Sequence, residues 1–302
     1  MAHCHHHHHH HPEISFENLN RVFIVSVILN AGFVVLEAAA GFWCNSVGLL
    51  SDAGHNLGDV LSLLLSMAAF RLSRRKVSEV YTYGYKKATV LASFLNALLL
   101  VAVSLVVMAE SVSKFTSPGN VEGDVVAWVA AAGVVVNGLT AFLLMRSMGN
   151  DINVKGAFFH MAADALVSVG VLVSGVLVSM TGLMLIDAVV GFCISVIILL
   201  PSLRLLRQSL RLLLDAVPET VDRSQVERLI RETVHVRDCH HLHIWAMSTT
   251  ETALTAHVVV DAYAYADEVK ADLCRKLREE GIHHLTFEVE TDGAECARRV
   301  CG

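Results

Sequence analysis

Two short segments of this 302-residue chain each carry a histidine and an aspartate four positions apart. The first segment holds His55 and Asp59, and the second holds His160 and Asp164. On an α-helix, residues four apart lie on one face, about 6 Å from each other along the axis. Two such helices facing each other would bring two imidazoles and two carboxylates to one point. This set suits tetrahedral Zn²⁺, whose bonds to these ligands are about 2.0–2.2 Å long.

The charges of this ligand set indicate what such a site would do. Zn²⁺ with two aspartates and two neutral imidazoles sums to zero, which a low-dielectric interior tolerates. Without the metal, two neighbouring carboxylates cannot both stay ionised at low cost, so protons must replace it on the aspartates or histidines. The pattern therefore predicts exchange of Zn²⁺ for protons. The alternative interpretation is that each His–Asp pair only forms hydrogen bonds, to itself or to a neighbouring helix.

Both pairs lie in long apolar stretches. The chain is 54% hydrophobic and only 17% charged, which is less charged than soluble domains usually are. A membrane core about 30 Å thick needs roughly 20 apolar residues per helix. Six windows meet this need, and Thr181, Gly182 and Asp187 mark the break between the last two. The windows are 22–43, 46–70, 88–110, 124–145, 156–180 and 183–203.

Lysine and arginine are distributed unevenly over the connections between these windows. They gather in the second connection (71–87), in the fourth and after the last window, whereas the third has only Lys114 and the first and fifth have none. Because positive residues favour the cytoplasmic side, we expect both termini in the cytoplasm. The short loops favour a bacterial inner membrane over a vesicle membrane. The net charge of −6, with no basic stripe, gives no reason to expect a nucleic-acid partner.

After Leu214 the composition becomes that of a small soluble domain. Its apolar spacing predicts a helix from 222, strands at 240–247 and 253–261, a helix at 266–280 and a strand at 283–290. The expected fold class is thus an α-helical membrane protein with six transmembrane helices, followed by a small α+β domain of order αββαβ. The expected organisation is a His-rich cytoplasmic N-terminal segment (1–20), a transmembrane domain (21–211) and a cytoplasmic domain (212–302).

Five segments together carry a family resemblance. They are SVGLLSDAGHNLGDV (46–60), YTYGYKKATVLASFLNALLL (81–100), NVKGAFFHMAADALVSVG (153–170), LLLDAVPE (212–219) and HHLHIW (240–245). The chain resembles the cation diffusion facilitator family, in the zinc-transporting branch of bacterial zinc efflux facilitators and animal vesicular zinc transporters. The resemblance, from about residue 20 to about 291, implies a homodimer that exports Zn²⁺ in exchange for H⁺ by alternating access. It also implies that the αββαβ domain is metallochaperone-like and serves metal binding and dimerisation.

The same resemblance implies further zinc ligands outside the membrane. They are His240, His257, His283, Glu290, the cysteine pair Cys296 and Cys301, and the N-terminal His3, Cys4 and His5 of the partner subunit. His283 and Glu290 are seven positions apart, about 23 Å in a regular strand, so we expect two sites. Glu290 would join His240 and His257 in one site. His283 would join the two cysteines in the other, although CARRVC departs from the usual C-x-x-C spacing.

For several other charged residues the sequence indicates a role outside the metal ligands. Glu37 stands where the family commonly has an acidic residue, and it would either relay protons or form a packing hydrogen bond. Asp52 would lie at the mouth of the zinc site or near the lipid headgroups. Asp187 would favour the N-terminus of its own helix. Lys87 and Asp215 match positions that related transporters join in an ion pair.

Other classes of function fit the sequence less well. A membrane-embedded zinc enzyme needs an open coordination position and a general base, whereas four protein ligands leave no vacancy and no H-E-x-x-H occurs. No segment resembles a kinase, a cyclase or a DNA-binding module, as a zinc sensor would require. We therefore expect a transporter and not an enzyme. Nitrogen–oxygen sites bind later transition metals generally, so Co²⁺, Cd²⁺, Ni²⁺ and Fe²⁺ remain alternative substrates.

Overall fold

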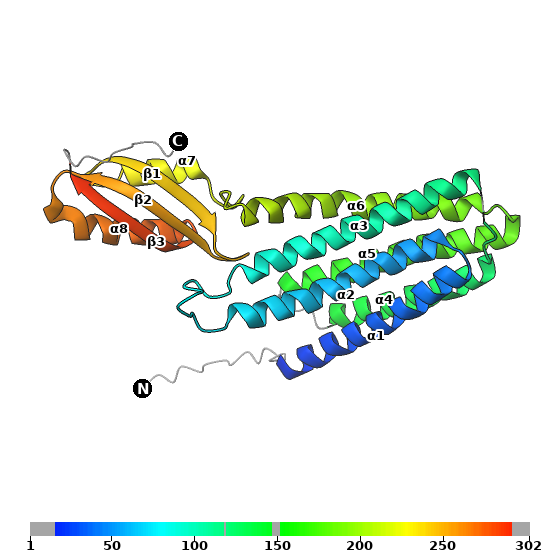
Figure 1. The fold of residues 1–302 in the computed structure, drawn as a ribbon. Helices are drawn as coiled ribbons and strands as arrows, with labels where there is room; N and C mark the ends of the chain where they lie inside the picture. The colour runs from blue at the N-terminus through cyan, green and yellow to red at the C-terminus, as the bar shows by residue number, and fades with distance from the viewer. Residues whose placement is uncertain (1–15, 118, 147–151, 292–302) are drawn as a thin grey trace, which may run out of the picture. The chain divides into compact units, whose positions relative to one another are not determined.

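The structure is a computed structural model that describes residues 16–117, 119–146 and 152–291 (Figure 1). Within these ranges six long helices come first, and one helix covers each predicted apolar window. They are α1 (Phe16–Trp43), α2 (Val47–Ser73), α3 (Ala88–Thr116), α4 (Gly123–Arg146), α5 (Ile152–Thr181) and α6 (Leu185–Leu213). The break between α5 and α6 falls where the sequence predicted it, at Gly182, whose positive φ of 68° suits glycine.

Four of these helices are long and apolar enough to cross a membrane, in the part of the chain that the structure describes. They are α3, α4, α5 from Phe159 onward, and α6. Helix α1 offers a shorter apolar stretch, Ile28–Trp43. The protein is therefore a helical membrane protein with four clear spans. Helix α2, which carries the first His–Asp pair, is not among the four.

The turn between α1 and α2 is fixed by side chains from two other helices. Asp187 lies in the first turn of α6, as predicted. Its carboxylate nevertheless serves α2, because it accepts hydrogen bonds from Ser46 Oγ at 2.5 Å and from the backbone N–H of Val47 at 2.7 Å. Lys114 of α3 donates to Asn45 Oδ1 at 2.8 Å and to the backbone oxygen of Asn45. These contacts set the position at which α2 begins.

Helices α4 and α5 approach each other closely because glycines face the contact. A Cβ atom on Gly175 would lie 2.6 Å from the backbone nitrogen of Ala127, and one on Gly123 would lie 2.5 Å from that of Ser179. Small residues at such positions let the backbones of membrane helices pack directly. The packing holds α5, which carries the second His–Asp pair, against α4.

The C-terminal region has the predicted order αββαβ. Its main elements are α7 (Arg223–Arg231), β1 (Val236–Ala246), β2 (Thr252–Val260), α8 (Ala266–Glu279) and β3 (Ile282–Thr291), with a short 3₁₀ turn (Tyr263–Tyr265) before α8. Strand β2 lies between the other two, antiparallel to β1 and parallel to β3 (Figure 1). Buried side chains of both helices, among them Ile230, Leu273 and Leu277, pack on one face of the sheet against strand residues such as Leu254. Because successive side chains of a strand point to opposite faces, every second residue of each strand lies on the face away from the helices.

Two neighbouring lysines ahead of α3 form ion pairs within the compact unit of residues 61–99 and 200–302. Lys87 pairs with Asp215, as the resemblance implied. Lys86, next to it, pairs with Glu251 in the turn between β1 and β2. The residues ahead of α3 are thus tied both to the end of α6 and to the sheet.

Candidate metal sites

Helices α2 and α5 bring the two predicted His–Asp pairs together. His55 Nε2 lies 3.1 Å from Asp164 Oδ1 and 3.9 Å from Asp59 Oδ2. His160 Nε2 lies 3.2 Å from Asp59 Oδ2 and 3.8 Å from Asp164 Oδ2. Each imidazole therefore contacts both carboxylates, and the shorter contact always crosses from one helix to the other. We call these four side chains the helix cage.

Three of the four cage residues, His55, Asp59 and Asp164, offer ligand atoms that all lie within 4.8 Å of one another, as a tetrahedral metal site requires. With bonds of about 2.0–2.1 Å, the ligand atoms of such a site are roughly 3.3 Å apart. The nitrogen–oxygen distances of 3.1–3.9 Å lie around this value. Asp59 Oδ2 and Asp164 Oδ2 are buried and form no hydrogen bond, and their contacts are with the imidazoles. A buried acceptor without a partner is costly, and a cation between the four side chains would satisfy both oxygens.

Exposure of the helix cage rises steadily from one side to the other. The side chain of Asp164 is 1% exposed, those of His55 and Asp59 are 21% and 26% exposed, and that of His160 is 45% exposed. Asp164 therefore forms the closed wall of the cage. His160 lies at its most exposed side.

A second layer of polar side chains lies beside the helix cage. It includes Asp52, whose position the sequence analysis predicted wrongly. Asp52 lies neither at the mouth of the cage nor at a surface, because it is fully buried between helices. Ser168 Oγ donates to Asp52 Oδ2 at 2.9 Å, and Asn56 Nδ2 donates to Glu37 Oε2 at 3.2 Å. The sequence analysis did not identify Asn56 or Ser168 as part of the site. Their only signal in the sequence is a polar residue four positions after Asp52 or Asp164 in an apolar window.

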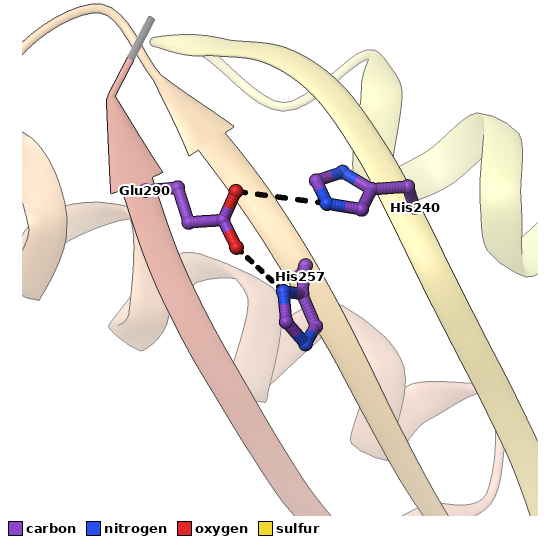
Figure 2. Close-up of side chains that lie close together, drawn as sticks. All are labelled: His240, His257 and Glu290. Atoms are coloured by element: carbon purple, nitrogen blue, oxygen red, sulfur yellow. Dashed lines mark hydrogen bonds and ion pairs between the residues drawn. The ribbon is translucent and has the colours of Figure 1, made fainter. Parts of the chain in front are cut away.

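Three strands bring His240, His257 and Glu290 together on the sheet face away from the helices (Figure 2). Their ligand atoms all lie within 4.8 Å of one another. His257 Nδ1 is 2.5 Å from Glu290 Oε1, and His240 Nε2 is 3.6 Å from Glu290 Oε2. Both ring nitrogens of His240 lack a hydrogen-bond partner although they are buried. We call these three side chains the sheet cluster.

The strand register explains how the sheet cluster forms. His240 on β1 lies directly opposite His257 on β2. A bulge follows immediately, with His241 at a positive φ of 49°, and the register shifts before His243. Such bulges re-aim side chains at functional positions. Glu290 reaches His257 from β3, where its neighbour Glu288 also approaches His257 Nε2, at 3.3 Å.

Of the remaining predicted ligands, His283 is the one that lies within the described residues, and it does not join the sheet cluster. His283 is exposed and lies at the opposite end of β3 from Glu290. The other predicted ligands, His3, Cys4, His5, Cys296 and Cys301, lie outside the described residues. Cys239 on β1 is a buried core residue, and burial raises the pKa of its thiol to about 11. It therefore stays protonated near neutral pH and is a poor metal ligand.

Comparison with known proteins decides the family. Residues 23–214 match the family described as "Cation efflux transmembrane domain", and residues 218–291 match "Cation efflux protein, cytoplasmic domain". The chain belongs to the cation efflux family. This result confirms the resemblance predicted from the sequence. Cation efflux proteins are transporters, so the expectation of a transporter and not an enzyme is confirmed too.

Curated relatives of this cation efflux protein come from several bacteria. Zinc transporter ZitB of Escherichia coli (strain K12) is 33% identical over 297 residues, which cover 96% of this chain and 93% of the relative. The cadmium, cobalt and zinc/H(+)-K(+) antiporter of Bacillus subtilis (strain 168) is 31% identical, over 90% of this chain and 89% of the relative. The metal cation efflux system protein CzcD of Cupriavidus metallidurans is 32% identical, over 90% and 87%.

Proposed function

We propose that this protein is a secondary transporter that exports Zn²⁺ from the cytoplasm in exchange for H⁺ by alternating access. The observation that carries the proposal is the ring of contacts in the helix cage, where each imidazole contacts both carboxylates. The names of two relatives, a zinc transporter and a cadmium, cobalt and zinc/H(+)-K(+) antiporter, support the substrate and the exchange.

The division of the ligands between helices supports alternating access. Helix α2 supplies His55 and Asp59, and α5 supplies His160 and Asp164. A small displacement of one helix against the other would split four ligands into two pairs and release the ion. The two carboxylates left behind then favour protons, because they cannot both stay ionised cheaply at short range. Metal and protons thus occupy the same side chains in alternate states.

The arrangement of the chain in the membrane is part of the proposal. We assign six spans, with a His-rich segment at 1–20, the transmembrane domain at 21–211 and the cytoplasmic domain at 212–302. Both termini face the cytoplasm of a bacterial cell, and the six spans lie in the lipid of its inner membrane. The match of residues 218–291 to the cytoplasmic domain of cation efflux proteins supports a homodimer joined through that domain.

The sheet cluster is proposed to hold a resident Zn²⁺. Two imidazoles and one carboxylate form a suitable donor set, and the unpartnered nitrogens of His240 fit this role. A fourth ligand would come from His3, Cys4 or His5 of the partner subunit. A second resident ion would bind His283, Cys296 and Cys301. These ions would stabilise the domain and the dimer.

A broader range of substrates is the second candidate function. It is favoured by the names of two relatives, one an antiporter of cadmium, cobalt and zinc and the other a metal cation efflux protein. The helix cage offers only nitrogen and oxygen ligands, and such sets accept several later transition metals. Cd²⁺, Co²⁺, Ni²⁺ and Fe²⁺ would then travel by the same route as Zn²⁺.

Metal uptake by proteoliposomes tests both candidates. We expect Asp59→Asn and Asp164→Asn to abolish Zn²⁺ uptake. The matched control is Asp124→Asn. Asp124 is an exposed carboxylate away from the cage, and it accepts a hydrogen bond from Ser179 Oγ. Parallel uptake of Co²⁺ and Cd²⁺ by the wild type decides between the narrow and the broad substrate range. Uptake by both cage variants at the wild-type rate would reject the proposed transport site.

A further inference from the structure

Two carboxylates with no exposed surface lie beside the helix cage without belonging to it. Glu37 of α1 and Asp52 of α2 are both 0% exposed. Asn56 Nδ2 lies 3.2 Å from Glu37 Oε2 and 3.5 Å from Asp52 Oδ1, so one amide serves both groups. The two carboxyl groups thus lie on either side of a single amide group. This buried pair is joined by Asn56 and is not paired with a lysine or arginine among the described residues.

The surroundings of the pair call for a proton. Glu37 Oε1 is buried and has no hydrogen-bond partner. Two ionised carboxylates offer only acceptors, so they cannot hydrogen-bond to each other, and their repulsion in a low-dielectric interior is large. A single proton between them supplies the missing donor and removes one of the two negative charges. The unpartnered oxygen is thus accounted for without a metal ion.

The pair is connected to both halves of the helix cage. Ser168 Oγ donates to Asp52 Oδ2 at 2.9 Å, and Asn137 Nδ2 of α4 donates to Ser168 Oγ at 3.4 Å. Asp52 precedes His55 by three residues on α2, and Ser168 follows Asp164 by four on α5, so each lies one turn from a cage ligand on the same helix face. His55 and Asp164 are the titratable cage groups that act electrostatically on Asp52. Helix α4 contributes only a neutral amide to this network within the described residues.

We propose that Glu37 and Asp52 share one exchangeable proton, which the pair releases when Zn²⁺ enters the helix cage. This inference rests on the function proposed above and adds a proton site that is separate from the four metal ligands. Zn²⁺ brings two positive charges to within about one helical turn of Asp52, roughly 5 Å along the axis. This charge favours the doubly ionised pair, so the shared O–H bond breaks. The electron pair stays on the carboxylate oxygen, the proton leaves to water, and it returns when the metal departs.

The test counts the protons that purified full-length protein releases as it binds Zn²⁺. A pH indicator in weakly buffered detergent solution gives the protons, and calorimetry in parallel gives the zinc bound. Glu37→Gln and Asp52→Asn remove the exchangeable proton but keep the size of each side chain. The matched control is Ser51→Ala, which removes a buried hydrogen bond to Ser195 beside the pair without touching a carboxyl group.

We expect wild type and Ser51→Ala to release equal numbers of protons per zinc. Glu37→Gln and Asp52→Asn should bind zinc and release about one proton fewer, because metal binding and proton release are linked through the lost site. Variants that bind zinc and release as many protons as the wild type would overturn the inference. A wild type that binds no zinc would instead contradict the proposed function.

A second measurement applies if the carboxyl variants do not fold. Infrared difference spectra with and without Zn²⁺ detect the carbonyl stretch of a protonated carboxyl group. Ser168→Ala removes the hydrogen bond to Asp52 and leaves every cage ligand in place. We expect zinc to abolish one such band in the wild type and the frequency of that band to shift in Ser168→Ala. A band that is the same in both proteins, or no band lost in either, would overturn the inference.

Discussion

Among the described residues, two clusters of histidines and carboxylates differ in the secondary structure that carries them. The helix cage takes two ligands from each of two helices, α2 and α5. The sheet cluster takes one ligand from each of three adjacent strands. A helix satisfies its own backbone hydrogen bonds, so α2 and α5 can shift against each other at moderate cost. The strands share their backbone hydrogen bonds, and His240 and His257 are direct partners in the ladder.

Under the proposed function, the scaffold, more than the ligand chemistry, distinguishes a transport site from a site that retains its ion. A site divided between two helices opens when one helix moves, whereas a site on one sheet opens only when the sheet is disrupted. The charges agree with this division. Zn²⁺ with two carboxylates gives a neutral helix cage, while Zn²⁺ with Glu290 alone gives a sheet cluster of charge +1. The neutral site suits passage through a membrane, and the charged site suits an aqueous surface.

The largest expected effect separates the two clusters by their role in transport. His55→Ala should lower the initial rate of zinc uptake by more than about 100-fold, because even changes around metal ligands typically cost about 10–100-fold. His257→Ala leaves the helix cage intact and should cost less than about tenfold, within the usual range of couplings between distant sites. Uptake rates of the two variants in proteoliposomes measure this directly. Equal losses in both would remove the distinction between the clusters.

A smaller effect concerns stability of the sheet. Zinc at about 100 times its dissociation constant should stabilise the C-terminal domain by about 2.7 kcal/mol. Hydrogen exchange of β2 and β3 in the full-length protein measures this protection, which Glu290→Gln should remove. Glu288→Gln is the matched control on the same strand. Protection that disappears in Glu288→Gln and survives in Glu290→Gln would show that Glu288, and not Glu290, is the zinc ligand.

The next effect tests how the helix cage is positioned. Asp187→Asn weakens the charge-assisted hydrogen bonds that hold the start of α2, and each buried charged bond is worth about 1.5–3 kcal/mol. The variant should therefore melt at a lower temperature in detergent and transport zinc more slowly. Asp124→Asn, at an exposed site, serves as the control. An unchanged melting temperature would show that the hydrogen bonds to Asp187 do not stabilise the start of α2.

The smallest expected effect is a pH dependence of the C-terminal domain. Burial alone would raise the pKa of Asp238, but hydrogen bonds from the backbone N–H of Cys239 and from Arg231 lower it overall. The resulting stabilisation is present above the ordinary aspartate pKa of about 4 and is lost as pH falls through the lowered value. Asp238→Asn should cost less than about 1 kcal/mol near neutral pH, because the ion pair is partly exposed. Hydrogen exchange of β1 should show a difference from the wild type that shrinks below about pH 4.

Local patterns in the sequence predicted much of this fold. Apolar windows placed the six long helices, and the His-x-x-x-Asp spacing picked out side chains that the structure brings together. The spacing of apolar residues also predicted the αββαβ order, although β1 begins at Val236, four residues before the predicted start. The errors concern contacts between elements distant in sequence. Asp187 holds the start of α2 from about 140 residues away, and Asp52 is buried by Ser168, 116 residues further along.

Zinc accumulation under an imposed pH gradient tests the central claim most directly. Sealed proteoliposomes that are acidic inside would contain the protein, with external Zn²⁺ and a zinc-sensitive dye in the lumen. Exchange through the helix cage predicts that zinc enters as protons leave. Accumulation should stop when a protonophore collapses the gradient, and it should be absent in Asp164→Asn. Zinc entry that ignores the gradient, or that persists in Asp164→Asn, would contradict this account.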